Sequence, residues 1–262
     1  YLASIEAYQQ ATALNDSYAW AYNGCGLSFK ALGRYEEAVL VFRKACKYEP
    51  AVVWHWYNLT ETLLSMARYR DALQPAREAT RVDPNHSQSW GKLGQVYRYL
   101  EQYSNAINAY DKAIALDPLF DWAINGKGIV LEQQARYTEA YEYYRRATEL
   151  NPERETYWYN QGNALYLMGK LDESLPMLRQ ALALNPNHTR SWATLASVLR
   201  QQNAYAEALD AVTKATEQDP TYAWAWHEMG LIFEAQADYE SAFNAFSTAH
   251  TCERDNHSHL YK

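Results

Sequence analysis

Apolar and small residues recur every three or four positions along residues 87–118, in two runs separated by a short polar break. That spacing places them on one face of a helix in each run. The first run contains Trp90, Leu93, Gly94 and Tyr97, and the second contains Tyr103, Ala106, Tyr110 and Ala113 ahead of Pro118. The pattern predicts two amphipathic helices packed across a tight turn, and its landmarks return every 34 residues along the chain.

A 34-residue period with W-x2-L-G-x2-Y, then A-x3-F, A and P, resembles the tetratricopeptide repeat (TPR). The resemblance covers the whole chain and implies an all-α fold, a right-handed α-solenoid superhelix of stacked helical hairpins. Residues 1–18 are then the second helix of a truncated first repeat, seven repeats fill residues 19–256, and residues 257–262 form a tail. The repeats begin at Ala19, Val53, Ser87, Asp121, Glu155, Thr189 and Ala223. Because the chain starts inside a repeat and without Met, we expect it to be a fragment of a longer protein.

Two prolines, Pro75 and Pro176, fall inside predicted second helices. Proline in a helix interior removes a hydrogen bond and typically costs about 3 kcal/mol. Since both lie near the second turn of their helix, we expect a smaller cost and a kink.

A weaker period of 102 residues, three repeats long, overlies the first. The segment 84–90, PNHSQSW, returns at 186–192 as PNHTRSW, and Tyr57-Asn58 returns as Tyr159-Asn160. Two explanations remain open: duplication of a three-repeat block without functional meaning, or equivalent binding pockets that recur along the array.

Composition excludes several classes of protein. The net charge is −7 with both signs mixed along the chain, which argues against a nucleic-acid or membrane-surface binder with a basic stripe. No apolar run approaches the roughly 18–20 residues of a membrane span. The three cysteines, Cys25, Cys46 and Cys252, have unrelated spacings that fit neither a disulfide framework nor a zinc site. We therefore expect a reducing, cytoplasmic setting.

The sequence predicts no enzyme, cofactor or metal site. It contains no glycine-rich phosphate loop, zinc-protease motif or nucleophile elbow. His257 and His259 lack further ligands nearby and are expected to be a solvated end. His86 and His188 fall in interhelical hinges, where a structural role is expected.

The resemblance implies that first helices line the concave inner face, through their second, fifth, sixth, ninth, twelfth and thirteenth residues. The predicted peptide-binding residues are Trp20, Asn23, Trp54, Tyr57, Asn58, Lys92, Arg98, Trp122, Asn125, Tyr159, Asn160, Asn163, Arg190, Arg200 and Trp224. Aromatic side chains beside amides and cations are typical of peptide recognition, because rings give contact area and amides satisfy a bound backbone.

Some tryptophans have an alternative role. Trp20, Trp122 and Trp224 would instead pack on the preceding hinge, beside Tyr18, Phe120 and Tyr222 respectively. For Trp56, Trp90, Trp158, Trp192 and Trp226, packing in the core is the favoured interpretation.

Chaperone-binding members of the family hold a terminal carboxylate with Lys and Asn on one first helix, Asn on the next, and Lys and Arg on the third. Asn58 with Lys92, and Asn160 with Arg190, match this clamp only in part. A heat-shock co-chaperone is therefore not favoured.

The favoured function is a protein–protein interaction scaffold that binds a peptide or helical segment of a partner in its groove. The alternatives are a regulatory or substrate-recruiting arm of a larger enzyme, and a self-assembling module that stacks through its terminal helices.

Overall fold

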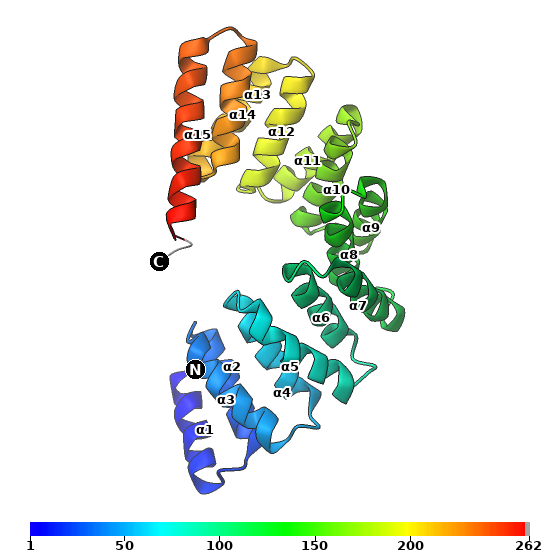
Figure 1. Cartoon of the computed structure of the whole chain (residues 1–262), viewed down its shortest axis with the longest axis vertical. Helices are drawn as coiled ribbons and strands as arrows, with labels where there is room; N and C mark the ends of the chain where they lie inside the picture. The colour runs from blue at the N-terminus through cyan, green and yellow to red at the C-terminus, as the bar shows by residue number, and fades with distance from the viewer. Residues whose placement is uncertain (260–262) are drawn as a thin grey trace. The chain divides into compact units, whose positions relative to one another are not determined.

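The structure is a computed structural model that describes residues 1–259, with side chains up to residue 254. Over the described residues the chain forms fifteen α-helices and no β-strand, which confirms the all-α repeat solenoid (Figure 1). The helices are α1 (Leu2–Leu14), α2 (Ala19–Ala31), α3 (Tyr35–Tyr48), α4 (Val53–Ser65), α5 (Tyr69–Val82), α6 (Ser87–Tyr99), α7 (Tyr103–Leu116), α8 (Asp121–Gln133), α9 (Tyr137–Leu150), α10 (Glu155–Leu167), α11 (Leu171–Leu184), α12 (Thr189–Gln201), α13 (Tyr205–Gln218), α14 (Ala223–Ala235) and α15 (Tyr239–His259). None of these helices is both long and apolar enough to cross a membrane.

The even-numbered helices α2 to α14 are the first helices of successive hairpins, and the odd-numbered helices are the second helices. The last helix runs to His259, beyond residue 256 where we had placed the end of the last repeat. The side chains of His257 and His259, for which a solvated end is expected, lie outside the described residues.

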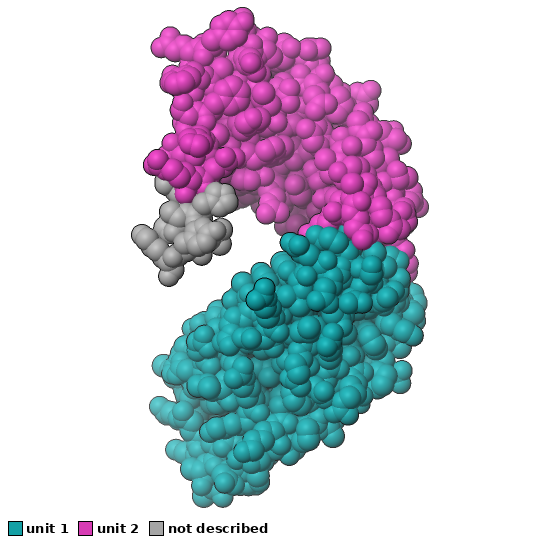
Figure 2. Space-filling view, viewed as in Figure 1, with its two compact units in different colours: residues 1–130 teal, residues 131–262 magenta. Residues whose placement is uncertain are grey.

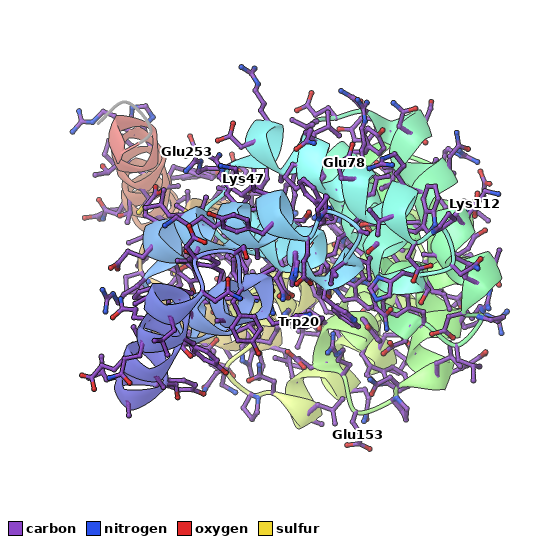
Figure 3. The ribbon with its side chains drawn as sticks, turned by 90° about the horizontal axis from the view of Figure 1, so that it is seen from below. Trp20, Lys47, Glu78, Lys112, Glu153 and Glu253 are labelled. Atoms are coloured by element: carbon purple, nitrogen blue, oxygen red, sulfur yellow. The ribbon has the colours of Figure 1, made fainter. Side chains whose placement is uncertain are left out.

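The chain divides into two compact units, and the boundary falls inside α8 (Figure 2). Unit 1 spans Tyr1–Val130 and unit 2 begins at Leu131. Large side chains that are fully buried form the core of each unit, Phe42, Leu63, Val96 and Tyr110 in unit 1 and Tyr144, Tyr157, Leu178 and Ile232 in unit 2. In unit 1, Lys47, Glu78 and Lys112 of the second helices follow one edge, and Trp20 of α2 lies away from that edge (Figure 3).

Close packing inside a hairpin depends on small residues of the first helix. A Cβ on Gly26 would lie 2.6 Å from the ring of Phe42, and a Cβ on Gly94 would lie 3.0 Å from the ring of Tyr110. Atoms cannot approach to 2.6 Å without displacement, so the aromatic side chain of α3 fits only because residue 26 has no side chain.

The turn between the two helices of each hairpin contains one residue in the left-handed conformation, with φ between 54° and 74°: Gly33, Ala67, Glu101, Ala135, Gly169, Asn203 or Ala237. The next amide donates to a carbonyl five residues earlier, as from Arg34 to Phe29 and from Ala204 to Leu199, both at 2.9 Å. This bond satisfies a carbonyl that the end of the helix leaves free. Glycine adopts positive φ readily, whereas a residue with a Cβ pays on the order of 1 kcal/mol.

Successive hairpins are joined by a hydrogen bond from a tryptophan to a hinge proline. The indole Nε1 atoms of Trp56, Trp90, Trp158, Trp192 and Trp226 donate to the carbonyl oxygens of Pro50, Pro84, Pro152, Pro186 and Pro220 at 2.8–2.9 Å. These five tryptophans are therefore packing residues, as the sequence indicated. Pro75 and Pro176 lie inside α5 and α11, which both continue through the proline.

Candidate functional site

The predicted residues lie on the first helices, whose neighbours contact each other directly within each unit: α2 with α4, α4 with α6, α10 with α12, and α12 with α14. We call the side of these helices that carries the predicted residues the first-helix face. In unit 1, Trp20 and Trp54 are 47% and 44% exposed there, large fractions for tryptophan. Asn23, Asn58 and Asn125, by contrast, are buried.

Three rings, two on α4 and one directly before α6, form an aromatic cluster in unit 1. The ring centroids of Trp54 and His86 lie 4.7 Å apart, those of Tyr57 and His86 lie 5.7 Å apart, and each pair meets edge to face. Nδ1 of His86 lies 2.7 Å from Oγ of Ser89, which orients the ring. Burial lowers the pKa of His86 and raises the pKa of Tyr57 to about 12. At neutral pH the cluster is therefore uncharged.

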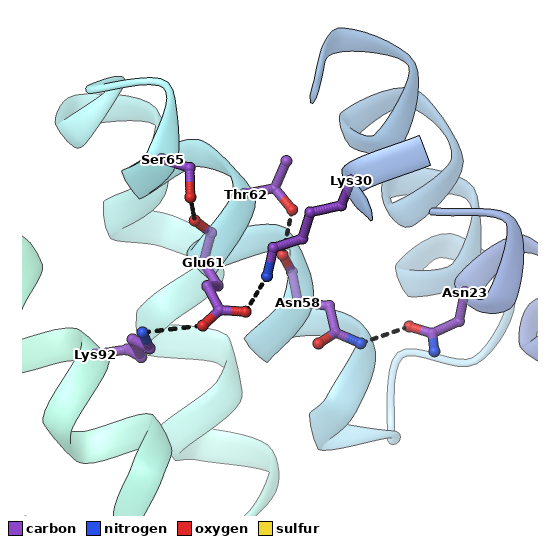
Figure 4. Close-up of polar contacts among 7 residues, drawn as sticks. All are labelled: Asn23, Lys30, Asn58, Glu61, Thr62, Ser65 and Lys92. Carbon is purple, nitrogen blue, oxygen red and sulfur yellow. Dashed lines mark hydrogen bonds and ion pairs between the residues drawn. The ribbon is translucent and has the colours of Figure 1, made fainter. Parts of the chain in front are cut away.

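A carboxylate between two lysines joins three consecutive first helices beside this cluster (Figure 4). Glu61 of α4 pairs with Lys30 of α2, and its other oxygen lies 3.1 Å from Nζ of Lys92 of α6. Burial alone would raise the pKa of Glu61, but hydrogen bonds and charge from the two lysines outweigh burial and lower it. The ammonium of Lys92 also lies 5.0 Å from the ring centroid of Trp122, within the range of a cation–π contact.

Two of the predicted asparagines bond to each other. Nδ2 of Asn58 donates to Oδ1 of Asn23 at 3.0 Å, and both side chains are more than nine-tenths buried (Figure 4). One donor of Asn58 and one acceptor of Asn23 therefore serve the contact between α2 and α4.

The tryptophans at the second place of a first helix differ in their contacts. Trp122 stacks on Phe120 with centroids 5.8 Å apart, and Trp224 packs on Tyr222 at 6.0 Å, so both lie against the preceding hinge. The ring of Trp20 instead meets the buried ring of His55 on the next first helix at 5.1 Å. Trp20 thus contacts the next first helix, as Trp54 contacts His86 directly before the next one.

Unit 2 repeats the tyrosine–histidine pair. The ring centroids of Tyr159 and His188 lie 4.9 Å apart, and Nδ1 of His188 lies 2.7 Å from Oγ of Ser191. That nitrogen also accepts the backbone N–H of Ser191 at 3.2 Å and so caps α12. Burial lowers the pKa of His188 and raises the pKa of Tyr159.

The charges of the unit 2 face are arranged differently. Glu132 accepts hydrogen bonds from the Tyr144 hydroxyl at 3.2 Å and from Nδ2 of Asn163 at 3.4 Å. Burial raises the pKa of Glu132, and these two hydrogen bonds offset only part of the rise. Nε of Arg200 lies 3.1 Å from the buried carboxylate of Glu228.

The remaining predicted residues are Asn160 and Arg190 of unit 2, half-buried and exposed respectively, and Arg98 of unit 1. The Arg98 guanidinium lies 4.1 Å from the ring centroid of Tyr99. His86 and His188 were not predicted to lie on the face, because a hinge position was interpreted as structural. Both histidines recur in the 102-residue period, and this recurrence was the sequence signal that could have indicated a place beside a tyrosine of the face.

Comparison with known proteins identifies the repeat. Tetratricopeptide repeat models match residues 21–52, 87–120, 125–175 and 159–223. No curated protein matches the chain.

Solved structures share the fold at low sequence identity. A chain of the APC/C hetero-tetramer Cut9–Hcn1 is 17% identical with a TM-score of 0.73, over 83% of this chain and 43% of that one, so this protein spans less than half of its length. A tetratricopeptide repeat protein from Parabacteroides merdae is 18% identical with a TM-score of 0.72, over 91% of this chain and 94% of that one. YrrB, described as a TPR protein with an unusual peptide-binding site, is 22% identical with a TM-score of 0.57, over 71% and 96%.

Proposed function

Because the chain belongs to the tetratricopeptide-repeat family, a family of protein-interaction scaffolds, we propose that its first-helix faces bind an extended peptide segment of a partner protein. The partner supplies any chemistry, and the chain itself needs no cofactor. The proposal includes a reducing, cytoplasmic setting, in keeping with the free and buried thiols of Cys25 and Cys46.

The observation that carries the proposal is the exposure of Trp20 and Trp54. Burying a large ring is strongly favourable, so two half-exposed tryptophans on adjacent helices leave contact energy for a ligand. Packed helices lie about 8–10 Å apart, and an extended chain rises about 3.3 Å per residue. In a polyproline II segment, where three residues make one turn of about 9.3 Å and every third side chain points the same way, apolar side chains three positions apart would reach one tryptophan each.

The neighbouring amides support an extended ligand. The bond between Asn58 and Asn23 uses one donor and one acceptor, so the acceptor Oδ1 of Asn58 and the donor Nδ2 of Asn23 remain for a peptide backbone. The description of YrrB as a protein with a peptide-binding site agrees with this use of the fold.

The test is selection of a display library of random twelve-residue peptides on the whole chain, followed by calorimetry with the peptides recovered. We expect the double variant Trp20→Ala/Trp54→Ala to bind at least about tenfold more weakly, because buried aromatic anchors dominate such interfaces. Leu40→Ala is the matched control, since Leu40 is 61% exposed on the second helix α3. Equal affinity for the wild type and the double variant would refute the proposal.

A further inference from the structure

Arg190 is a cation on the unit 2 face with no ion pair among the described residues. It is the second residue of α12 and is exposed. Its charge nevertheless acts on three neighbours: it opposes the rise in the pKa of Tyr159 and of Tyr222, and adds to the fall in the pKa of His188. Arg190 follows His188 by two residues, and Tyr159 and Tyr222 both pack against the core cluster to which Ala193 of α12 belongs.

The three neighbours present hydrogen-bond donors at neutral pH. Burial raises the pKa of Tyr222 to about 12 and also raises that of Tyr159, so both phenols keep their protons. Nδ1 of His188 accepts the amide of Ser191, which places the proton of the neutral ring on Nε2. A ligand that satisfies a guanidinium and several donors must itself offer acceptors, and an anion does so best.

A buried hydroxyl adds an independent observation. Thr194 lies one turn after Arg190, is 1% exposed, and its Oγ1 has no hydrogen-bond partner. It comes close to the Tyr159 hydroxyl without a hydrogen bond of normal geometry. Buried hydroxyls are nearly always hydrogen-bonded, so an unpartnered one at this place points to a group that the face receives from outside.

Nearby carboxylates leave Arg190 available. Glu155 acts to raise the pKa of His188, Asp219 that of Tyr222, and Glu132 that of Tyr159. None of these carboxylates forms an ion pair with Arg190 among the described residues. One oxygen of Asp219 already accepts from the backbone and the hydroxyl of Thr221.

The corresponding place in unit 1 lacks this arrangement. Residues 102 positions earlier are Gln88 in place of Arg190 and Phe120 in place of Tyr222. The cation beside the unit 1 tyrosine is Lys92, which already pairs with Glu61. Arg190→Gln and Tyr222→Phe therefore give unit 2 the residues that unit 1 has at these two positions.

We infer that unit 2 binds an anionic group of the partner peptide, held by the Arg190 guanidinium and the hydroxyls of Tyr159 and Tyr222. The inference rests on the proposed peptide-binding function. The anion is an acidic side chain, a terminal carboxylate or a phosphorylated side chain, which share the acceptor chemistry that these donors recognise.

The experiment is an NMR titration of the whole chain that follows the Nε–Hε signal of Arg190. The probes are N-acetyl-aspartate N-methylamide, N-acetyl-alanine and N-acetyl-phosphoserine N-methylamide, one for each source, with N-acetyl-asparagine N-methylamide as the neutral control. We expect the anionic probes to move the signal and the neutral probe to leave it in place, and added salt to weaken the effect.

Variants locate the anion. Binding of the probe that binds most tightly, followed through the amide of Ser191, should weaken at least about tenfold in Arg190→Gln and about threefold or more in Tyr222→Phe. Arg154→Gln is the matched control, because Arg154 is an exposed cation directly before α10. A neutral probe that shifts the signal equally, or an unchanged affinity in Arg190→Gln, would overturn the inference.

The peptides recovered from the display library separate the two proposals. If they bind through Trp20 and Trp54 but show no dependence on Arg190, the anion site fails and the scaffold function stands. If the anionic probes bind at Arg190 and no peptide is recovered, the peptide-binding function fails and the anion site stands.

Discussion

Tyr57 of unit 1 and Tyr159 of unit 2 hold the same place in their hairpins, and each meets a histidine that precedes the next first helix. The polar residues around them differ. Lys30, Glu61 and Lys92 form a chain of ion pairs in unit 1. The residues 102 positions later are Glu132, Asn163 and Thr194, which include one carboxylate and no cation.

The 102-residue period is therefore kept in the tryptophan and histidine contacts and lost among the charged and polar residues of the first-helix faces. The indoles of Trp90 and Trp192 form the same bond to a proline, and the histidines contact the same type of serine. Because equivalent pockets would need equivalent charges, this difference favours two sites that recognise different chemical groups.

The largest effect is expected when Asn163 of unit 2 is replaced by glutamate, the residue that unit 1 has at the equivalent position 61. Asn163→Glu sets a second carboxylate beside Glu132, where Nδ2 of Asn163 now lies 3.4 Å from it. We expect a loss of about 2–3 kcal/mol in the free energy of unfolding at pH 7.5, measured by urea denaturation, because one carboxyl must charge beside another or bind a proton.

The pH dependence gives the sign of this effect. A carboxyl whose pKa is raised in the folded state costs stability above its unfolded pKa, near 4.5, and the cost disappears as the pH falls below that value. The loss should therefore shrink at pH 4.5. Adding Glu132→Gln should restore most of the stability at pH 7.5, and an equal loss in the double variant would contradict the explanation.

The reverse exchange, Glu61→Asn, should have a smaller effect. It leaves Lys30 and Lys92 without a carboxylate although their side chains are only 25% and 18% exposed, and we expect a loss of about 1–2 kcal/mol at pH 7. Since the pKa of Glu61 is lowered in the folded state, its contribution is complete above the unfolded pKa and is lost as the pH falls through the folded one.

Glu37→Gln is the control for this substitution, because Glu37 pairs with Arg34 while 45% exposed. We expect it to leave the free energy of unfolding nearly unchanged, because solvent screens an exposed ion pair. A Glu61→Asn variant no less stable than this control would remove the assigned role of the lysine–glutamate chain.

The smallest effect concerns His188 of unit 2, whose counterpart in unit 1 is His86. His188 caps α12 by accepting the Ser191 amide, so His188→Ala should cost about 1 kcal/mol, and His188→Asn, another good cap, less than about 0.5 kcal/mol. Because the folded pKa of His188 is lowered, the wild type should also lose stability as the pH falls below about 6.5, and His188→Asn should lose less. Thermal unfolding at pH 7.5 and pH 5.5 measures both, and equal losses in the two variants would exclude the cap.

Much of the fold follows from spacing alone, because the recurrence of apolar residues sets where each helix begins and which face it buries. The left-handed turn residues were not foreseen, since Ala67 and Glu101 adopt positive φ against their own preference and the backbone bond of the turn holds them there.

The candidate site was foreseen less completely. Register placed Tyr57 and Tyr159 on the first helices, but it could not show that Asn58 bonds to Asn23 or that Glu61 lies between two lysines. Those outcomes depend on side-chain contacts between hairpins, which a periodic pattern does not encode.

Among the described residues of each unit, the helices that contact each other are neighbours in the chain or next but one. A force that pulls on one terminus would therefore act on one interface between hairpins at a time, and the hairpins would detach one after another. Each 34-residue hairpin that detaches would release roughly 110 Å of extended chain, at about 3.3 Å per residue. The protein would thus lengthen in steps under force. Hairpins far from the pulled terminus would keep their ligands until they themselves detached.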